Sequence, residues 1–197
     1  MIKRAIDILL SAVALVVLLP AFVVIALAVM FGSRGGVFFR QTRIGKDGHS
    51  FHLLKFRSMR PGSESVGQLT VGQRDPRITG VGHFLRRTKL DELPQLFNIL
   101  LGHMSIVGPR PEVPRYVALY TAEQRQVLSV RPGLTSLASI AYINENEVLG
   151  RSTDPEHAYI NVIMPAKLAL DLKYVREQSL ALDLRIIFGT IGRLFGG

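Results

Sequence analysis

An uncharged apolar run near the N-terminus constrains this chain more than any other feature of its sequence. From Ile8 to Phe31 there are 24 residues without a charged side chain, and only Ser11 and Pro20 interrupt the apolar character. About 18 apolar residues mark a candidate membrane helix, whereas the apolar part of a signal peptide has about 7–15. We therefore expect this segment to be retained in a membrane, and no later apolar run approaches its length.

Pro20 lies near the middle of this run and influences how the segment can enter a bilayer. Proline has no N–H, and its ring pushes on the carbonyl four residues earlier, so a kink or break is expected there. Basic residues flank the run on both sides, at Lys3, Arg4, Arg34 and Arg40. Because the positive-inside rule then gives no orientation, the residues fit either a kinked spanning helix or a re-entrant helix whose ends share the cytoplasmic face.

Composition excludes several classes of protein. An apolar fraction of 48% is enough to bury a core, so the chain is not disordered. The absence of cysteine excludes a disulfide scaffold, a thiolate nucleophile and any cysteine-based metal site. The five histidines lack paired ligand spacing, so we expect no zinc site.

The excess positive charge is concentrated directly after the apolar run. Residues 31–90 carry 12 basic and 3 acidic side chains, a surplus equal to the whole formal net charge of +9. Arginine supplies 18 of the 24 basic residues, and its planar fork suits phosphate groups. This stretch is therefore predicted to bind a polyanion, which leaves nucleic acid, anionic lipid headgroups and a nucleotide diphosphate as classes of partner.

Local patterns after the apolar run predict mostly short helices and few strands. The expected elements are a strand at 37–39, a strand or short helix at 51–59, a loop at 60–82, an extended segment at 108–114, and helices at about 83–90, 93–101, 121–130 (with Thr121 as N-cap), 166–178 and 180–195. The last helix carries one apolar face, formed by Leu180, Leu184, Ile187, Ile191 and Leu194. That face fits either a membrane surface or the protein core.

Asp91 and Glu92 form an acidic pair that is a candidate for chemistry. Because Pro94 disfavours helix at the residue before it, the pair is expected at a helix end or start. Three cations precede it, at Arg86, Arg87 and Lys89. Such a pair can serve only as a helix cap and surface ion pairs, or it can supply a carboxylate nucleophile and Mg²⁺ ligands beside phosphate-binding cations. Two carboxylates suit Mg²⁺, which takes its other ligands from phosphates and water.

Two further groups of residues are candidates for phosphate binding. One is the Lys55-Phe56-Arg57-Ser58 stretch, and the other is Pro109-Arg110-Pro111. Since Arg110 lies between two prolines, its backbone loses little freedom on binding, which favours a phosphate clamp. The alternative is a rigid loop that points its arginine into solvent.

In these motifs the sequence resembles the bacterial sugar transferase family of small polyprenol-phosphate phosphoglycosyltransferases. The most specific stretches are Leu90-Asp91-Glu92-Leu93-Pro94-Gln95 and Val107-Gly108-Pro109-Arg110-Pro111. Further matching stretches run in order through nearly the whole chain: Lys3-Arg4 with Asp7, Phe39 to Gly45, Lys55 to Met59, Asp75 to Thr79, Gly82 to Leu85, Asn98, Met104 to Ile106, Arg131 to Thr135 and Leu182 to Leu184.

The resemblance implies a fold and a location. It implies an α+β, mostly helical protein, with a re-entrant membrane helix broken at Pro20 within residues 1–33. Residues 34–197 are then a cytoplasmic catalytic domain with interfacial amphipathic helices. The protein is expected at the cytoplasmic (inner) membrane of a bacterium, in contact with its lipids.

The resemblance also implies a reaction. Family members transfer a phosphosugar from a UDP-sugar to a polyprenol phosphate, usually undecaprenyl phosphate, and release UMP, which begins an exopolysaccharide, a capsule or an O-antigen. Asp91 is then the nucleophile that forms a covalent phosphosugar, Glu92 is its partner, and both are expected to hold Mg²⁺. Substrate contacts are expected from Lys55, Arg57, Arg77, Arg86, Arg87 and Arg110.

The alternative hypothesis is a non-enzymatic, membrane-anchored basic module that binds anionic lipid or nucleic acid. Under this hypothesis the acidic pair and Arg110 have no evident purpose, so we expect no nucleic-acid partner.

The chain also departs from the common family pattern at three places. Leu19 stands where many members have Ser, and His103 stands where many have Asp in a Gly-Asp-Met-Ser motif. Residues 134–147 replace a stretch that commonly ends in Asn-Gly-Arg-Asn.

Overall fold

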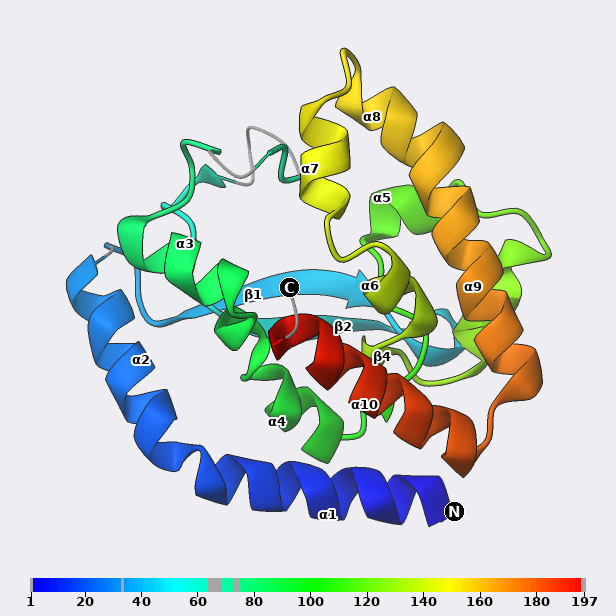
Figure 1. Cartoon of the computed structure of the whole chain (residues 1–197), viewed down its shortest axis with the longest axis horizontal. Helices are drawn as coiled ribbons and strands as arrows, with labels where there is room; N and C mark the ends of the chain where they lie inside the picture. The colour runs from blue at the N-terminus through cyan, green and yellow to red at the C-terminus, as the bar shows by residue number, and fades with distance from the viewer. Residues whose placement is uncertain (1, 33, 64–68, 73–74, 196–197) are drawn as a thin grey trace.

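Two N-terminal helices frame two sides of a domain built from short helices and two small sheets (Figure 1). The computed structural model describes residues 2–32, 34–63, 69–72 and 75–195. Helix α1 (Ile2–Val17) runs along the bottom of Figure 1, and α2 (Leu19–Gly32) continues up its left side. The protein is α+β and mostly helical, as predicted.

The remaining elements are short. They are β1 (Phe38–Ile44), β2 (Ser50–Phe56), α3 (Gly80–Arg87), α4 (Gln95–Leu100), β3 (Ser105–Val107), α5 (Pro114–Val117), β4 (Gly133–Thr135), α6 (Leu137–Ala141), α7 (Glu145–Gly150), α8 (Pro155–Ala158), α9 (Met164–Glu177) and α10 (Leu180–Phe195). Two short 3₁₀ helices are also present, η3 (Leu90–Glu92) and η4 (Gln124–Ser129).

Each sheet has two strands. Strands β1 and β2 form an antiparallel hairpin in which Phe38 pairs with Phe56. Strands β3 and β4 are parallel, and the close packing requires glycine directly after β3 and at the start of β4. A Cβ on Gly108 would lie 2.4 Å from the Arg131 carbonyl oxygen, and one on Gly133 would lie 2.1 Å from the Gly108 nitrogen. These close approaches bring the Val107–Pro111 motif against the Arg131–Thr135 motif.

The break between α1 and α2 lies at Leu18, two residues before Pro20. Pro20 is the second residue of α2, where proline is tolerated, and it cannot donate the helical hydrogen bond to the Val16 carbonyl. Among the described residues, no single helix is long and apolar enough to cross a bilayer, but α1 and α2 together have that length and composition and are bent by 64°. This geometry fits a broken span or a re-entrant loop.

Helix α2 buries one stripe on the domain. Phe22, Ile25 and Val29 pack with Phe56 of β2 and Leu85 of α3, and the rings of Phe22 and Phe56 are 5.2 Å apart. The rest of α2 presents apolar side chains outward, at Leu19, Val23, Val24, Leu27, Met30 and Phe31. The apolar run is therefore joined to the domain along one face and exposed on the other.

Asn98 fixes α4 against β2. Its Oδ1 accepts a hydrogen bond from the Leu54 N–H at 2.9 Å, and its Nδ2 donates to the His52 carbonyl at 2.8 Å. Since Lys55 follows Leu54 in β2, and α4 follows the acidic pair, these two bonds set the position of Lys55 relative to that pair.

Most of the predicted elements are present with shifted boundaries. The strand expected at 37–39 extends to Ile44, and the ambiguous stretch 51–59 is strand β2. The four helices expected at 83–90, 93–101, 166–178 and 180–195 correspond to α3, α4, α9 and α10. Residues 64–68 and 73–74 of the expected loop at 60–82 lie outside the described residues.

The α-helix predicted over 121–130 is wrong. The structure has the 3₁₀ segment η4 instead, although Thr121 does act as a cap, because its Oγ1 accepts a hydrogen bond from the Gln124 N–H at 3.2 Å. Only Val127 of this segment is buried. With a single apolar anchor, a longer helix would gain too little from packing to offset the cost of ordering it.

Helix α10 packs partly against the protein core and partly exposes its apolar side chains, so it fits both of the predicted roles for its apolar face. Ile186 and Asp183 are buried against the domain, and Ile187 is half-buried. Most of the predicted apolar face points outward instead, at Leu180, Leu184 and Ile191, together with Phe188. The side chain of Leu194 lies outside the described residues.

The topology of the bent pair can be tested with single cysteines, since the chain has none of its own. If the pair is re-entrant, Ile2→Cys and Arg34→Cys will react with an impermeant maleimide from the same side of sealed inverted vesicles. Labelling of the two positions from opposite sides would establish a bent span instead.

Candidate active site

A cavity of about 1280 Å³ opens in the centre of the domain. Its walls come from β1, β2, η3, the 110–116 segment, α6, α7, α9 and the C-terminal half of α10. Asp91 and Glu92 both line it, as do Lys55 and Arg110. The acidic pair and two of the cations predicted to contact the substrate therefore share one cavity.

The acidic pair occupies a single tight turn between two helices. Helix α3 ends at Arg87, η3 carries Asp91 and Glu92, and α4 starts at Gln95 after Pro94. The predicted position at a helix end or start is confirmed. Lys89, just before this turn, has a left-handed backbone with φ of 58°, which is uncommon for a residue with a side chain and costs free energy.

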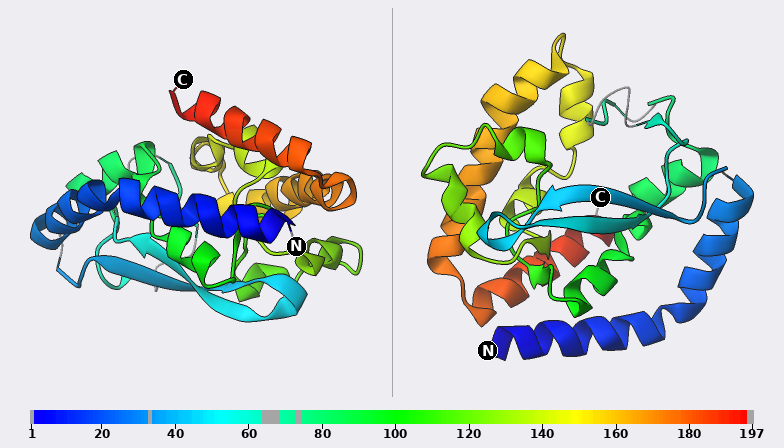
Figure 2. Two further views of the ribbon diagram at one scale, coloured as in Figure 1. Left: turned by 90° about the horizontal axis from the view of Figure 1, so that it is seen from below. Right: turned by 180° about the vertical axis from the view of Figure 1, so that it is seen from behind.

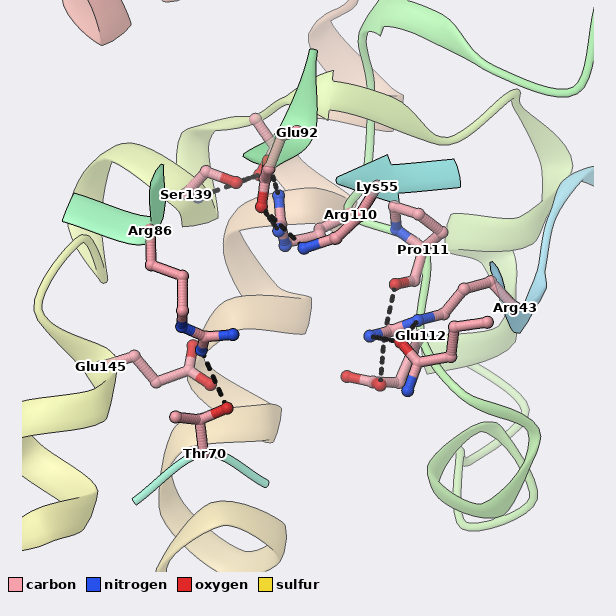
Figure 3. A network of polar contacts seen from close by, with 12 residues as sticks. Arg43, Lys55, Thr70, Arg86, Glu92, Arg110, Pro111, Glu112, Ser139 and Glu145 are labelled. Atoms are coloured by element: carbon pink, nitrogen blue, oxygen red, sulfur yellow. Dashed lines mark hydrogen bonds and ion pairs between the residues drawn. The ribbon is translucent and has the colours of Figure 1, made fainter. Parts of the chain in front are cut away.

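Glu92 is held between two cations from other elements (Figure 3). Lys55 of β2 donates from Nζ to Oε1 at 2.9 Å, and Arg110 donates from Nη2 to the same oxygen at 2.6 Å. Burial opposes ionisation of Glu92, but Arg110 and Lys55 outweigh burial and hold the pKa of this carboxyl well below its ordinary value. Glu92 is thus a fixed anion that orients both cations.

Asp91 has the opposite environment. It is 3% exposed, and its Oδ1 is buried without a hydrogen-bond partner among the described residues. Burial raises the pKa of this carboxyl, and the charges of Lys55, Arg86 and Lys89 oppose the rise. Asp91 thus keeps a carboxylate oxygen without a partner among the described residues, whereas both oxygens of Glu92 are engaged.

Arg110 points at Glu92 rather than into solvent. The loop that carries it is fixed from behind by Arg43, whose Nη1 donates to the Pro111 carbonyl at 2.9 Å and to Glu112 Oε1 at 2.9 Å. Tyr159 donates a short hydrogen bond to the other oxygen of Glu112. Glu92 raises the pKa of Arg110, which stays charged. In Figure 3, the contacts of Arg110 with Glu92 lie on one side of Pro111, and the contacts of Arg43 with Glu112 lie on the other.

The other predicted phosphate ligands have different surroundings. Arg86 lines the cavity, and its Nη2 donates to Thr70 Oγ1 at 2.9 Å. Arg57 also lines it but donates to the carbonyls of Gly36 and Phe38.

Arg77 and Arg87 are placed differently again. Arg77 lines the cavity and forms an ion pair of 2.6 Å with Asp75. Arg87 is exposed and is not among the described residues that line the cavity.

Asp171 is a cavity residue that the sequence did not single out. It is 3% exposed on α9, its Oδ2 lies 3.4 Å from the Arg110 N–H, and its Oδ1 has no partner among the described residues. Burial raises its pKa to about 7. A single acid inside the otherwise apolar run Leu168-Ala169-Leu170-Asp171-Leu172 was the available signal.

The site has the donor set for a hard cation. Among the described residues, no group of three or more His, Asp or Glu could hold a metal ion. Mg²⁺ needs only one or two protein carboxylates when phosphates and water complete its shell, and the unpaired Oδ1 of Asp91 is an oxygen of the right kind. Both oxygens of Glu92 accept hydrogen bonds from the cations Lys55 and Arg110.

Comparison with known proteins shows the relationship of the whole chain. The family model described as "Bacterial sugar transferase" matches residues 1–197. A protein of Rhizobium leguminosarum bv. phaseoli named exopolysaccharide production protein PSS is 43% identical over 197 residues, which cover 96% of this chain and 93% of that protein.

Other relatives are longer proteins, and this chain matches less than half of their length. The UDP-glucose:undecaprenyl-phosphate glucose-1-phosphate transferase of Escherichia coli K12 is 39% identical over 203 residues, and the match covers 99% of this chain but 40% of that protein. A UDP-N-acetylgalactosamine-undecaprenyl-phosphate N-acetylgalactosaminephosphotransferase of Aeromonas hydrophila is 35% identical, with 44% of its length covered.

The raised pKa of Asp171 predicts a pH dependence of stability. The folded protein keeps the Asp171 proton up to about pH 7, whereas the unfolded chain loses it near the ordinary value of 3.8. Relative to Asp171→Asn, the wild type should lose about 1.4 kcal/mol of unfolding free energy per pH unit between pH 5 and 7.

Unfolding of both proteins in detergent micelles, followed by circular dichroism from pH 4 to pH 8, measures this difference. Asp47→Asn, in the exposed β1–β2 turn, is the matched control for removal of one carboxylate. Parallel pH profiles of wild type and Asp171→Asn would contradict the prediction.

Proposed function

Because the chain belongs to the bacterial sugar transferase family, we propose that it transfers a sugar phosphate from a UDP-sugar to undecaprenyl phosphate and releases UMP. The names of the E. coli and A. hydrophila relatives support both substrates, and the R. leguminosarum name supports a role in exopolysaccharide production. The observation that carries the proposal is the unpaired carboxylate oxygen of Asp91 beside a Glu92 whose charge is balanced by Lys55 and Arg110.

In the first proposed step, a carboxylate oxygen of Asp91 attacks the phosphorus that bears the sugar. A bond forms between that oxygen and phosphorus, and the bond from phosphorus to the bridging oxygen of the diphosphate breaks. The bridging oxygen leaves as part of UMP, and the sugar phosphate remains on Asp91 as an acyl phosphate. The nucleophile is the ionised carboxylate, so the step itself transfers no proton.

In the second proposed step, a phosphate oxygen of undecaprenyl phosphate attacks the same phosphorus. The bond between phosphorus and Asp91 breaks, the carboxylate is regenerated, and the product is a polyprenyl diphosphate sugar. Both steps would use in turn the cavity that Asp91 and Glu92 line.

Cations around the pair would stabilise the charge that builds on the transferring group. Arg110 and Lys55 are already held in place by Glu92, so they need not reorganise when the substrate binds. Arg86 lines the same cavity, and its charge acts on Asp91. A bound Mg²⁺, held by Asp91 and Glu92, would supply further charge neutralisation of the diphosphate.

An acceptor with a long prenyl chain stays in a bilayer, so the cavity has to lie near the membrane surface. Apolar side chains are exposed on the outer faces of α1 and α2. Others are exposed at Phe84 of α3, at Phe97 of α4 and Leu101 just after it, and at Leu184 and Phe188 of α10. In the left view of Figure 2, α3 and α10 lie on one side of the molecule and the β1–β2 hairpin lies on the other. We propose that this apolar side meets the bacterial cytoplasmic membrane with α1 and α2 re-entrant.

The alternative of a non-enzymatic basic module finds no support. Its basic stretch is largely occupied within the protein, since Lys55, Arg57 and Arg77 bind Glu92, backbone carbonyls and Asp75 respectively.

Replacement of Asp91 tests the nucleophile. Asp91→Asn should insert and unfold like the wild type but lose at least about 1000-fold in UMP release from UDP-sugar plus undecaprenyl phosphate. Wild type mixed with the UDP-sugar alone should gain the mass of one sugar phosphate on the peptide that contains residue 91. Retained turnover in Asp91→Asn would exclude this role.

The neighbouring arginines Arg86 and Arg87 provide a matched pair. Arg86 lines the cavity and Arg87 does not, so Arg86→Ala should lower kcat/KM for the UDP-sugar by about 10- to 100-fold while Arg87→Ala changes it by less than about 3-fold. A UMP-release assay on the two purified variants measures this. Equal losses would mean that the two side chains act alike.

A further inference from the structure

The first two turns of α1 carry charged side chains that face the domain although the helix is otherwise apolar. Asp7 is 4% exposed and Ser11 is fully buried, whereas Leu9, Val13 and Val16 of the same helix are exposed. Positions 3, 4, 7 and 11 follow helical spacing, so Lys3, Arg4, Asp7 and Ser11 form one stripe. A polar stripe on an apolar helix is costly unless its groups find partners. Ser11 Oγ has no hydrogen-bond partner among the described residues, whereas the three charged side chains do.

Asp7 finds its partners on β3. Its Oδ2 accepts a hydrogen bond from Ser105 Oγ at 2.8 Å, and its Oδ1 accepts one from the Ile106 N–H at 3.1 Å. Strand β3 ends at Val107 and leads through Gly108 and Pro109 to Arg110, so the carboxylate of Asp7 fixes the strand from which the Arg110 loop starts.

Arg4 finds its partners at the end of α4. Its Nη1 donates to the Ile99 carbonyl at 2.6 Å, and its Nη2 donates to the Leu100 carbonyl at 3.1 Å. A cation is favourable there, because the last carbonyls of a helix lack partners and carry partial negative charge. Since α4 begins directly after Pro94, this contact holds the helix that follows the acidic pair.

Lys3 finds its partner on α10. Its Nζ lies 2.6 Å from Asp183 Oδ2, while the other oxygen of Asp183 accepts a hydrogen bond from the Tyr174 hydroxyl at 2.7 Å. The same hydroxyl lies 3.1 Å from the Val107 carbonyl. Lys3 therefore joins α1 to the helix that forms one cavity wall, and through Tyr174 to the end of β3.

We infer that Lys3, Arg4 and Asp7 are positioning residues that place β3, α4 and α10, and through them Arg110, the acidic pair and one cavity wall, relative to the membrane helix. Seating of α1 and assembly of the active site are then one event. This inference rests on the proposed function for its kinetic consequences, but its structural consequence does not depend on that function.

Substitution of Asp7 separates positioning from mere stability. Asp7→Ala leaves the Ser105 hydroxyl and the Ile106 N–H without their partner, and we expect kcat for UMP release, per molecule of folded and inserted protein, to fall about 10-fold with KM for the UDP-sugar unchanged. Asp7→Asn keeps an oxygen acceptor at the same place, so it should recover most of this loss. An unchanged kcat in folded Asp7→Ala would overturn the inference.

Hydrogen exchange gives a readout that does not need activity. Amides of residues 105–110 should exchange faster in Asp7→Ala than in the wild type, while those of residues 50–56, in the β1–β2 hairpin, should not change. Equal protection of residues 105–110 in both proteins would overturn the inference. If the wild type releases no UMP, the proposed function fails, and this comparison still decides the positioning role.

The ion pair between Lys3 and Asp183 can be exchanged. Lys3→Asp and Asp183→Lys alone should each lower kcat, and the double variant should recover part of it, because the pair is restored while Tyr174 loses one acceptor. The control is the pair of Arg176 and Glu123, which is 3.0 Å long and exposed on both sides, and its exchange should leave kcat unchanged. A double variant no better than the worse single one would exclude the role of Lys3.

Discussion

The sharing of Glu92 between Lys55 and Arg110 is the interaction on which the site depends. The three residues come from a hairpin strand, a one-turn helix and a proline-bounded loop, and one carboxylate holds all three. A buried ion pair gains little stability overall, because desolvation costs about as much as the attraction returns. Its value here is geometric, since two cations are fixed at a cavity wall before any phosphate arrives, and the adjacent Asp91 keeps an unpaired oxygen.

The same arrangement explains why two neighbouring carboxylates can behave differently. Glu92 has cations on both oxygens and a pKa well below its ordinary value, whereas burial raises the pKa of Asp91. A charged Glu92 beside Asp91 further opposes ionisation of Asp91, and Lys55 and Arg86 counteract this effect. The approach of a cation to Asp91 would favour the ionised form that a nucleophile requires.

The apolar N-terminal pair has two sides with different requirements. Its outer side exposes large apolar residues, and its inner side buries Phe22, Ile25 and Val29 in the domain and satisfies Asp7 with β3. Because a buried Asp7 carboxylate without hydrogen-bond partners would be costly, the register of α1 against the domain is strongly specified. The apolar helix pair is in this sense part of the framework of the domain, because polar and apolar contacts both fix its position.

The sequence by itself determined the long apolar run with its proline and the mostly helical character of the chain. It also identified Asp91, Glu92, Lys55 and Arg110 as candidate site residues. The spacing of apolar residues, the chemistry of proline and the order of motifs are local properties, so they can be read without a structure. The tertiary structure alone decided which cations meet Glu92, that Arg87 lies outside the cavity, and that Asp171 lines it. It also decided that Asp7, 98 residues from Ser105, is bonded to it. These facts depend on which distant segments pack together, and no local pattern encodes that.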